Sequence, residues 1–259
     1  MTLVFNAGNT NVTTGVFDGD RLIFQLRIRT NINYTEDQYF SVIYTLLKKE
    51  GIELSKIKGA IIGSVVPAVT HILEHMVKKY LKVKPVMLGQ GVKLNIKNKY
   101  KNSAEVGDDR IANAAAAAGY FKNQDAVIID FGTAVSFDVV SKKGEYLGGA
   151  IMPGLNLALY SLFSRTAKLP QVNLAFPQKM IGDTTEKSIQ SGILNGILGA
   201  INYLVNGIKA EIKAKKVRVI LTGGDCDLIP IGKIKEKNIC ADKNLTLKGF
   251  NLIYKMNKK

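Results

Sequence analysis

The sequence feature that most constrains the fold is an arrangement of strands and turns that occurs twice. Each copy contains an apolar strand, a turn with glycine, and two further strands. The first copy comprises Leu3–Phe5, the turn Asn6–Thr10, Val12–Phe17 and Arg21–Ile28; the second comprises Ala126–Ile129, the turn Asp130–Ala134, Val135–Val140 and Glu145–Ala150. The copies begin about half a chain apart, so the pattern predicts a structural duplication.

Helical segments alternate with the remaining strands in both halves. Helical periodicity and short apolar runs predict helices at Glu36–Glu50, Ala68–Tyr80, Arg110–Gly119, Leu155–Phe163 and Glu186–Lys213, and strands at Ala60–Ser64, Val86–Leu88 and Val217–Thr222. This order predicts an α/β fold with a duplicated mixed sheet. We divide the chain into domains at residues 1–118 and 119–259, and we expect them to meet across a cleft because no low-complexity linker separates them.

The bulk properties exclude several classes of protein. The chain has 259 residues, of which 46% are apolar, so it is expected to be globular and not disordered. The first residues carry no basic segment typical of a signal peptide, and no apolar run reaches the roughly 18 residues of a membrane span. Two cysteines, Cys226 and Cys240, match neither a disulfide framework nor a paired zinc site. We therefore expect a cytoplasmic protein without a membrane partner.

The net charge of +15 leaves three explanations open. It is compatible with a nucleic-acid surface, with an anionic small substrate, or with a composition biased toward lysine. The lysines do not cluster with interleaved aromatic residues, as they do in many nucleic-acid-binding surfaces. We therefore predict no nucleic-acid partner, and note that a basic protein attracts polyphosphates.

The two glycine-containing turns are candidates for binding phosphate. In Asn6–Thr10 and Asp130–Ala134, a glycine lets backbone approach a ligand beside hydroxyl and amide side chains. A third turn, Thr222–Gly224, follows another buried strand. Each could be an ordinary hairpin turn, but three at strand ends favour a triphosphate site. Neither the P-loop pattern nor the dinucleotide-binding glycine pattern is present.

Gly107, Asp108, Asp109 and Arg110 precede an alanine-rich helix. One aspartate is expected to cap the helix while the other projects with Arg110 into a cleft. In that position a carboxylate can accept a proton from a substrate hydroxyl beside a cation, an arrangement that suits phosphoryl transfer. Capping alone is the simpler alternative.

A rival motif lies in the second predicted helix. His71, Glu74 and His75 match the H-x-x-E-H pattern of a group of zinc peptidases, with both histidines on one helix face. No downstream segment stands out as a third ligand. A surface helix with two histidines explains the pattern more simply.

Taken together, these residues resemble the type III pantothenate kinases of the actin, acetate-kinase and sugar-kinase superfamily. The resemblance covers nearly the whole chain. The blocks that carry it are Gly8–Asn11, Gly15–Gly19, Ser64–Pro67, Glu105–Arg110, Asp130–Ala134, Gly148–Ile151, Pro153–Gly154, Arg165–Pro170, Gln190–Gly192 and Thr222–Gly224.

The resemblance implies two ribonuclease-H-like lobes around a nucleotide cleft. It also implies phosphorylation of pantothenate by ATP, the first step toward coenzyme A, with Mg²⁺, a monovalent cation (K⁺ or NH₄⁺) and a homodimer. By the family pattern, Asp109 is catalytic and Asp130 binds the monovalent cation. The pattern assigns pantothenate binding to Tyr100, Gly107, Asp108, Arg110 and, across the dimer interface, Thr185; it assigns ATP binding to Asn6, Ala7, Gly8, Asn9, Thr10, Asn11, Val12, Thr13 and Thr133.

Two positions depart from the family pattern. Asp108 replaces a residue that is usually small, and its charge is expected to raise the pKa of Asp109. Asn6 stands where the family has an aspartate that organises Mg²⁺ and its waters, so metal binding is expected to weaken. The alternative function is therefore a weakly active or inactive relative that acts as a binding or regulatory protein.

Overall fold

The computed structural model describes residues 1–89 and 91–258. The chain forms two compact units, one of Met1–Tyr120 with Leu245–Lys259 and one of Phe121–Asn244. Our division after residue 118 assigned the C-terminal residues to the second lobe. The structure instead groups them with the first unit, because the last helix packs there, as described below.

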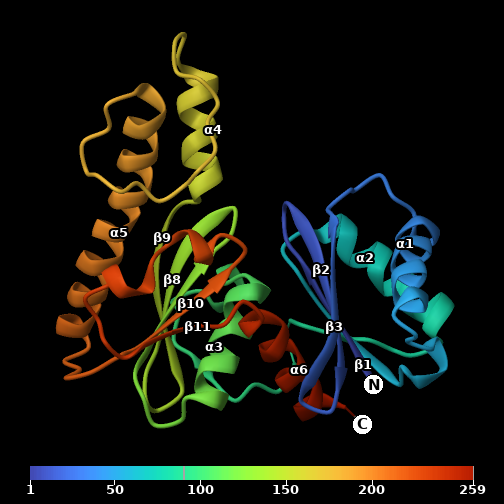
Figure 1. Cartoon of the computed structure of the whole chain (residues 1–259). Coiled ribbons are helices and arrows are strands. Elements are labelled where there is room, and N and C mark those ends of the chain that lie inside the picture. The colour runs from blue at the N-terminus through green and yellow to red at the C-terminus, as the bar shows by residue number, and fades with distance from the viewer. Residues whose placement is uncertain (90, 259) are drawn as a thin grey trace. The chain divides into compact units, whose positions relative to one another are not determined.

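The sheet of the first unit combines an antiparallel meander with two parallel strands. Its strands are β1 (Thr2–Ala7), β2 (Asn11–Asp18), β3 (Arg21–Arg29), β4 (Gly59–Ser64) and β5 (Val86–Met87), in the order β3-β2-β1-β4-β5 (Figure 1). β1 pairs antiparallel with β2 and parallel with β4. Parallel pairing brings the carboxyl ends of β1 and β4 to one edge of the sheet, where Ala7 is opposite Ser64.

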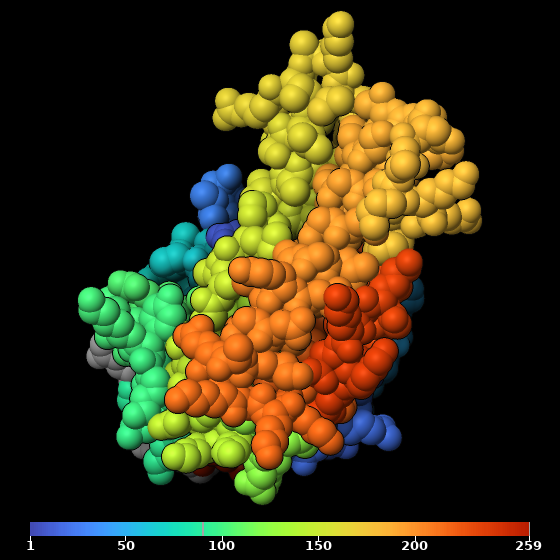
Figure 2. All heavy atoms as spheres, turned by 90° about the vertical axis from the view of Figure 1, so that its left-hand side faces the viewer, coloured from blue at the N-terminus to red at the C-terminus, as the bar shows by residue number. Residues whose placement is uncertain are grey.

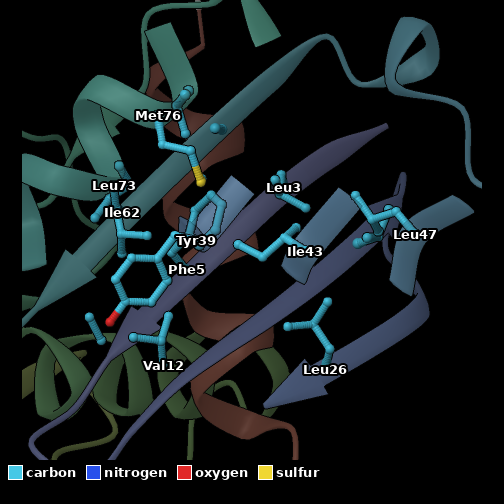
Figure 3. Packing of buried hydrophobic residues seen from close by; sticks show 14 of the residues in the cluster. Leu3, Phe5, Val12, Leu26, Tyr39, Ile43, Leu47, Ile62, Leu73 and Met76 are labelled. Carbon is cyan, nitrogen blue, oxygen red and sulfur yellow. The ribbon is translucent and has the colours of Figure 1, made fainter. Parts of the chain in front are cut away.

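Helices α1 (Glu36–Lys49) and α2 (Pro67–Met76) cover one face of this sheet. Their apolar sides meet alternate strand residues, so that Phe5 and Ile62 pack against Tyr39, Ile43 and Leu73 (Figure 3). Complete burial of such side chains contributes roughly 1.5–3 kcal/mol each. Leu3, Phe5 and Ala7 of β1 belong to this cluster and the buried Val4 does not, so alternate residues of the strand face the helices.

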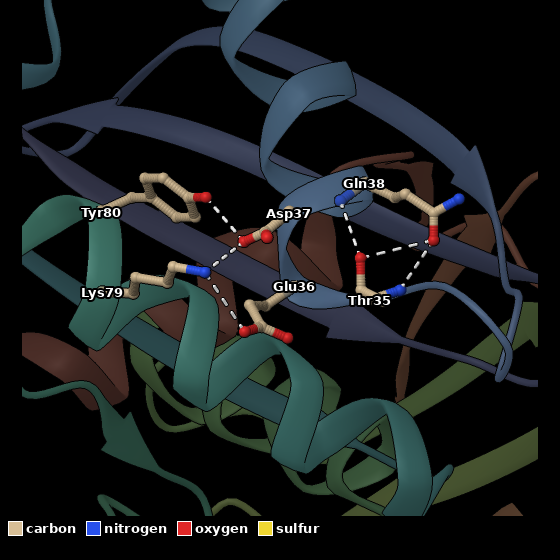
Figure 4. Close-up of polar contacts among 6 residues, drawn as sticks. All are labelled: Thr35, Glu36, Asp37, Gln38, Lys79 and Tyr80. Carbon is tan, nitrogen blue, oxygen red and sulfur yellow. Dashed lines mark hydrogen bonds and ion pairs between the residues drawn. The ribbon is translucent and has the colours of Figure 1, made fainter.

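Local sequence determines where α1 begins and how it is tied to its neighbour. The backbone N–H of Gln38 donates to Thr35 Oγ1 over 3.3 Å, and the N–H of Thr35 donates to Gln38 Oε1 over 2.9 Å, which forms a capping box. Beyond α2, the π-helical turn Val77–Leu81 presents Lys79 and Tyr80 to Asp37 (Figure 4). These contacts are exposed, so they orient the helices more than they stabilise them.

Two helices pack closely together elsewhere in the first unit, α3 (Asp108–Tyr120) and α6 (Leu245–Asn257). A Cβ placed on Gly249 of α6 would lie 1.9 Å from the carbonyl oxygen of Ala112 in α3, so only glycine fits there. The ring of Phe250 fills the space beside Gly63 of β4. Helix α6 was not predicted from the sequence, and its packing on α3 and β4 explains why the C-terminus belongs to this unit.

The second unit repeats the topology of the first. Its strands β7 (Ala126–Phe131), β8 (Ala134–Val140), β9 (Glu145–Pro153), β10 (Arg218–Gly223) and β11 (Ile239–Ala241) lie in the order β11-β10-β7-β8-β9. β7 pairs antiparallel with β8 and parallel with β10, as β1 does with β2 and β4. The predicted duplication and the ribonuclease-H-like fold of both lobes are confirmed.

Helices α4 (Leu155–Arg165) and α5 (Thr185–Glu211) complete the second unit. The C-terminal half of α5 packs on the sheet, whereas its N-terminal half and α4 extend beyond the sheet (Figures 1 and 2). A small cluster of Leu159, Val172 and Ile189 joins them there.

The remaining short elements of the chain are β6 (Lys97–Asn98) and 3₁₀ turns at Leu54–Lys56, Ser103–Glu105, Cys226–Leu228 and Ile231–Lys233.

Across the described residues, none of the helices combines the length and apolar character needed to cross a bilayer.

Candidate active site

The turn between β1 and β2 is held by backbone and hydroxyl contacts. The N–H of Gly8 donates to the carbonyl oxygen of Asn11 over 3.0 Å. The hydroxyl of Thr30, the residue after β3, donates to the Gly8 carbonyl over 2.6 Å. The N–H of Thr30 donates to the carbonyl of Thr10 over 2.9 Å. These bonds leave the side chains of Asn9 and Thr10 exposed at the tip, where a ligand can reach them.

The residues predicted to bind ATP at this turn differ in accessibility. Ala7 and Val12 are completely buried, so they can offer a ligand only backbone groups. Asn6, Gly8, Asn11 and Thr13 are partly exposed, and Asn6 is opposite Thr13 and Gly63 in the sheet. The structure therefore brings the predicted nucleotide turn to the edge of the sheet at which β4 also ends.

Asp109 lies in the first turn of α3. Its Oδ1 accepts a hydrogen bond from the backbone N–H of Arg110 over 2.8 Å. A Cβ on Gly107 would lie 2.7 Å from the same oxygen, so glycine leaves room for the carboxylate. Burial raises the pKa of Asp109, while the N–H and the charge of Arg110 oppose the shift. A carboxylate with a raised pKa is better suited to receive a proton from a hydroxyl.

Asp108 makes a different contact. Its Oδ2 accepts a hydrogen bond from the backbone N–H of Ser64, at the end of β4, over 2.8 Å. Burial and, secondly, the charge of Asp109 raise the pKa of Asp108 to about 6, against the effect of the Ser64 N–H. The predicted N-cap role is wrong, because α3 already includes both aspartates in its first turn. In that turn the helix dipole still favours negative charge.

The charge of Asp108 was expected to raise the pKa of Asp109. The pKa of Asp109 is raised, but the principal cause is burial. Repulsion between the two carboxylates instead raises the pKa of Asp108.

Backbone contacts join the start of α3 to the nucleotide turn. The N–H of Val65 donates to the carbonyl of Ala7 over 3.0 Å, which links the residue after β4 to the last residue of β1. Asp109 and the turn at Gly8 therefore lie at the same edge of one sheet. Tyr100 is partly exposed before this helix, and its N–H donates to Asn98 Oδ1 over 2.9 Å.

In the second unit, Asp130 occupies the position in β7 that Asn6 occupies in β1. Asp130 is opposite Ser136 of β8 and Thr222 of β10, so the three side chains share one face of the sheet. A Cβ on Gly223 would lie 2.5 Å from Asp130 Oδ1. The Thr222 hydroxyl is buried and has no hydrogen-bond partner within residues 1–89 and 91–258.

Thr133 lies in the exposed turn after β7. Its carbonyl accepts a hydrogen bond from the N–H of Gly154 over 3.1 Å, and a Cβ on Gly154 would come within 2.5 Å of the carbonyl oxygens of Gly132 and Thr133. From the sequence, Gly154 and Gly223 had no individual role, since they occurred only within the blocks of the family resemblance. Their close packing against the Asp130 turn is the signal that gives them a structural role.

Thr185 is the first residue of α5, in the part of the second unit that extends beyond the sheet (Figure 1). Its side chain is exposed, and the preceding Thr184 caps the helix by accepting from the N–H of Lys187 over 3.2 Å. Within the second unit, Thr185 is therefore not part of the turn that holds Thr133.

The rival zinc-peptidase motif does not form a metal site. His71 and His75 are exposed on α2, and Glu74 forms an ion pair of 2.5 Å with Lys78. No cluster of three or more histidine, cysteine, aspartate or glutamate side chains suited to a metal occurs in the part of the chain that the structure describes.

Two surface hollows lie beside α1 and not at these turns. They measure about 350 and 310 Å³. Tyr34, Asp37, Gln38, Ser41 and Val42 line the first, and Glu36, His75, Lys78 and Lys79 line the second. Both are shallow and contain none of the predicted site residues.

Comparison with known proteins places the chain in a family. The family model for type III pantothenate kinase matches residues 2–207. Type III pantothenate kinases from Finegoldia magna and Syntrophus aciditrophicus are 41% and 43% identical to it over 99% of the chain, and these matches cover 97% and 100% of the relatives. A solved structure of a Campylobacter jejuni protein assigned to the Baf family of transcriptional activators has a TM-score of 0.58 at 24% identity, covers 98% of both chains and shows the same fold. The chain belongs to the type III pantothenate kinase family.

Proposed function

We propose that this protein transfers the γ-phosphoryl group of ATP to the hydroxyl group of pantothenate, which gives 4'-phosphopantothenate in the first step of coenzyme A biosynthesis. Family membership supports the reaction. The structural observation that carries it is the position of Asp109, a carboxylate with a raised pKa at the sheet edge that also holds the turn at Gly8.

Asp109 orients the attacking hydroxyl group and receives its proton as the new bond to phosphorus forms. The bond between the γ-phosphorus and the ADP oxygen breaks in the same transfer. Because the transition state of phosphoryl transfer is loose, alignment and charge neutralisation provide most of the rate enhancement. Arg110 supplies positive charge for the pantothenate carboxylate or for the transferring group.

The two glycine turns would hold the phosphates of ATP. Gly8, Asn9, Thr10 and Asn11 offer backbone and polar groups at the first turn, and Thr133 offers a hydroxyl at the second. Asn6, Ala7, Val12 and Thr13 complete the proposed ATP set, with Ala7 and Val12 contributing through backbone only.

Metal ions would be held mainly by ATP and a few protein oxygens. A kinase of this family uses ATP with a divalent metal, and we propose Mg²⁺, which is commonly bound through phosphates and one or two carboxylates and offsets the charge of the phosphates. The Asn6 amide oxygen fits such a site but carries no charge. For the monovalent cation, K⁺ or NH₄⁺, we propose Asp130, beside the unpartnered hydroxyl of Thr222.

Pantothenate would bind near the start of α3, with Tyr100, Gly107 and Arg110 as the proposed residues. Thr185 would reach this site from a second copy of the chain, so we propose a homodimer. The region around Thr185 exposes large apolar side chains, including Tyr160, Met180 and Ile181, at 62%, 72% and 84% of their surface. Exposure of this extent is typical of an interface between protein chains. The cytoplasmic location remains a prediction from the sequence.

A silent relative that binds but does not transfer is the second candidate, and Asn6 favours it. ADP release measured with and without pantothenate separates the two. We expect release to depend on pantothenate and to fall sharply in Asp109→Asn, whereas binding of an ATP analogue remains. A protein that binds ATP and pantothenate without releasing ADP is the silent relative.

A further inference from the structure

The start of α3 is tied to the end of β4 by one carboxylate. The last residue of β4 and the two residues after it donate their backbone N–H groups to three different acceptors. Ser64 N–H donates to Asp108 Oδ2 over 2.8 Å, Val65 N–H donates to the Ala7 carbonyl over 3.0 Å, and Val66 N–H donates to Ser64 Oγ over 3.0 Å. Of these three acceptors, only the Asp108 carboxylate belongs to α3, the helix that carries Asp109.

We propose that Asp108 is a positioning residue, whose carboxylate joins α3 to β4 and thereby holds Asp109 in register with the nucleotide turn after β1. This inference rests on the proposed function, since it concerns how Asp109 is aimed. It departs from the family-based expectation that Asp108 contacts pantothenate, because Oδ2 is already engaged by Ser64.

Close packing leaves little freedom at this junction. A Cβ on Gly63 would lie 3.2 Å from Asp108 Cβ and 2.1 Å from the Phe250 ring, and one on Gly107 would meet Val65 at 3.2 Å. The backbones of β4 and α3 can therefore approach only where glycine is present. In such a site a shift of about 1 Å can reduce the rate as much as 100-fold.

The charged groups nearest to Asp108 lie on its own helix. Asp109 and Arg110 are its charged neighbours on α3. The neighbours from other elements are uncharged: Gly63 and Ser64 of β4, and Phe250 of α6. The charge of Asp109 contributes to the raised pKa of Asp108, whereas burial and Arg110 determine the pKa shift of Asp109. Removal of the Asp108 carboxylate should therefore affect the rate through the position of Asp109 and not through its ionisation.

Two substitutions separate the hydrogen bond from the charge. Asp108→Asn keeps an oxygen that can accept from Ser64 but removes the charge, whereas Asp108→Ala removes both. We expect kcat within about twofold of the wild type for Asp108→Asn, and a loss of roughly 10- to 100-fold for Asp108→Ala. Asp18→Ala, at an exposed hairpin, is the matched control and should leave kcat unchanged.

Equal rates in Asp108→Ala and the wild type, or an Asp108→Asn variant as slow as Asp108→Ala, would overturn the proposal. So would a selective rise in the KM for pantothenate with unchanged kcat in both variants, because that is the signature of direct substrate contact.

A second measurement needs neither turnover nor the alanine variant. In the wild-type protein, the amide proton shift of Ser64, followed by NMR, should titrate with a midpoint near the pKa of Asp108, about 6, and the titration should vanish in Asp108→Asn. A flat response between pH 5 and 7.5 rejects the bond. If the titration is present but pantothenate-dependent ADP release is absent, the proposed function fails while the link between Asp108 and Ser64 stands.

Discussion

β1 and β7 hold the same place in their sheets, but they end in different chemistry. Asn6 is opposite Thr13 of β2 and Gly63 of β4, and Asp130 is opposite Ser136 of β8 and Thr222 of β10. The first position therefore carries a neutral amide and the second a carboxylate. In the first unit the carboxylates come instead from α3, at Asp108 and Asp109.

This difference shows that duplication of a fold does not duplicate the charge of its ligand turns. The turns after both strands are exposed and contain glycine, so both suit phosphate. Only the second turn follows a strand that contains a carboxylate, Asp130 of β7, and a carboxylate attracts a cation. In the proposed function, the first unit therefore orients the acceptor hydroxyl and the second holds the cation.

The largest effect on the rate is expected at Asp109, a carboxylate of the first unit to which no residue of the second unit is proposed to correspond. Asp109→Asn should lower kcat by about 10²–10⁴-fold, the usual contribution of a positioned acid or base. The KM for ATP should change little, because the residue addresses the acceptor. Steady-state kinetics with an ATP-analogue binding assay measures both. Full activity in this variant contradicts the assignment of Asp109.

A stability experiment compares the helices of the two units. Gly249 of α6 packs on the Ala112 carbonyl, whereas Gly207 of α5 has open space at its Cβ position. Gly249→Ala should destabilise the protein by about 1–3 kcal/mol through overpacking, and Gly207→Ala should stabilise it by up to about 1 kcal/mol. Urea unfolding measures both. Equal effects in the two variants contradict the close packing of α3 and α6.

These helices also show what the sequence could and could not predict. Most strands were predictable because short apolar runs ended in glycine turns, and the repeated order revealed the duplication. The short strands β6 and β11 were not predicted, because two or three residues carry no periodic signal. Helix α6 escaped prediction because Gly249 and Asn251 interrupt its apolar pattern, and both are buried by tertiary packing. The pairing of Asp108 with Ser64 joins residues 44 positions apart, so no local pattern could predict it. The local motif Gly107–Arg110 pointed to the start of α3, but only the family resemblance distinguished Asp109 from Asp108.

A smaller effect is expected when the second unit is made to resemble the first. Asp130→Asn should raise the K⁺ concentration for half-maximal rate by roughly tenfold, which corresponds to about 1.4 kcal/mol of lost attraction. The wild type should require K⁺ or NH₄⁺ and lose most activity in Na⁺ alone. Cation titrations with choline to fix ionic strength provide the measurement. A wild type indifferent to the cation removes Asp130 from the proposed site.

The smallest effect is expected from the reverse change in the first unit. Asn6→Asp is nearly isosteric, and the partly exposed side chain lies at the end of a strand whose neighbours, Thr13 and Gly63, need not move. The added charge should attract hydrated Mg²⁺ and lower the concentration for half-maximal rate by a fewfold, about 1 kcal/mol or less, as expected for a partly solvated charge. Turnover should rise accordingly.

A Mg²⁺ titration of pantothenate-dependent ADP release in both versions tests this comparison. Asn9→Asp is the matched control, since it adds the same charge at the exposed tip of the same turn. If both variants shift the titration equally, the effect is one of general charge and not of the strand position. If the wild type already turns over rapidly and Asn6→Asp leaves the titration unchanged, the position does not govern metal binding. The difference between β1 and β7 would then reflect only the cation site of the second unit.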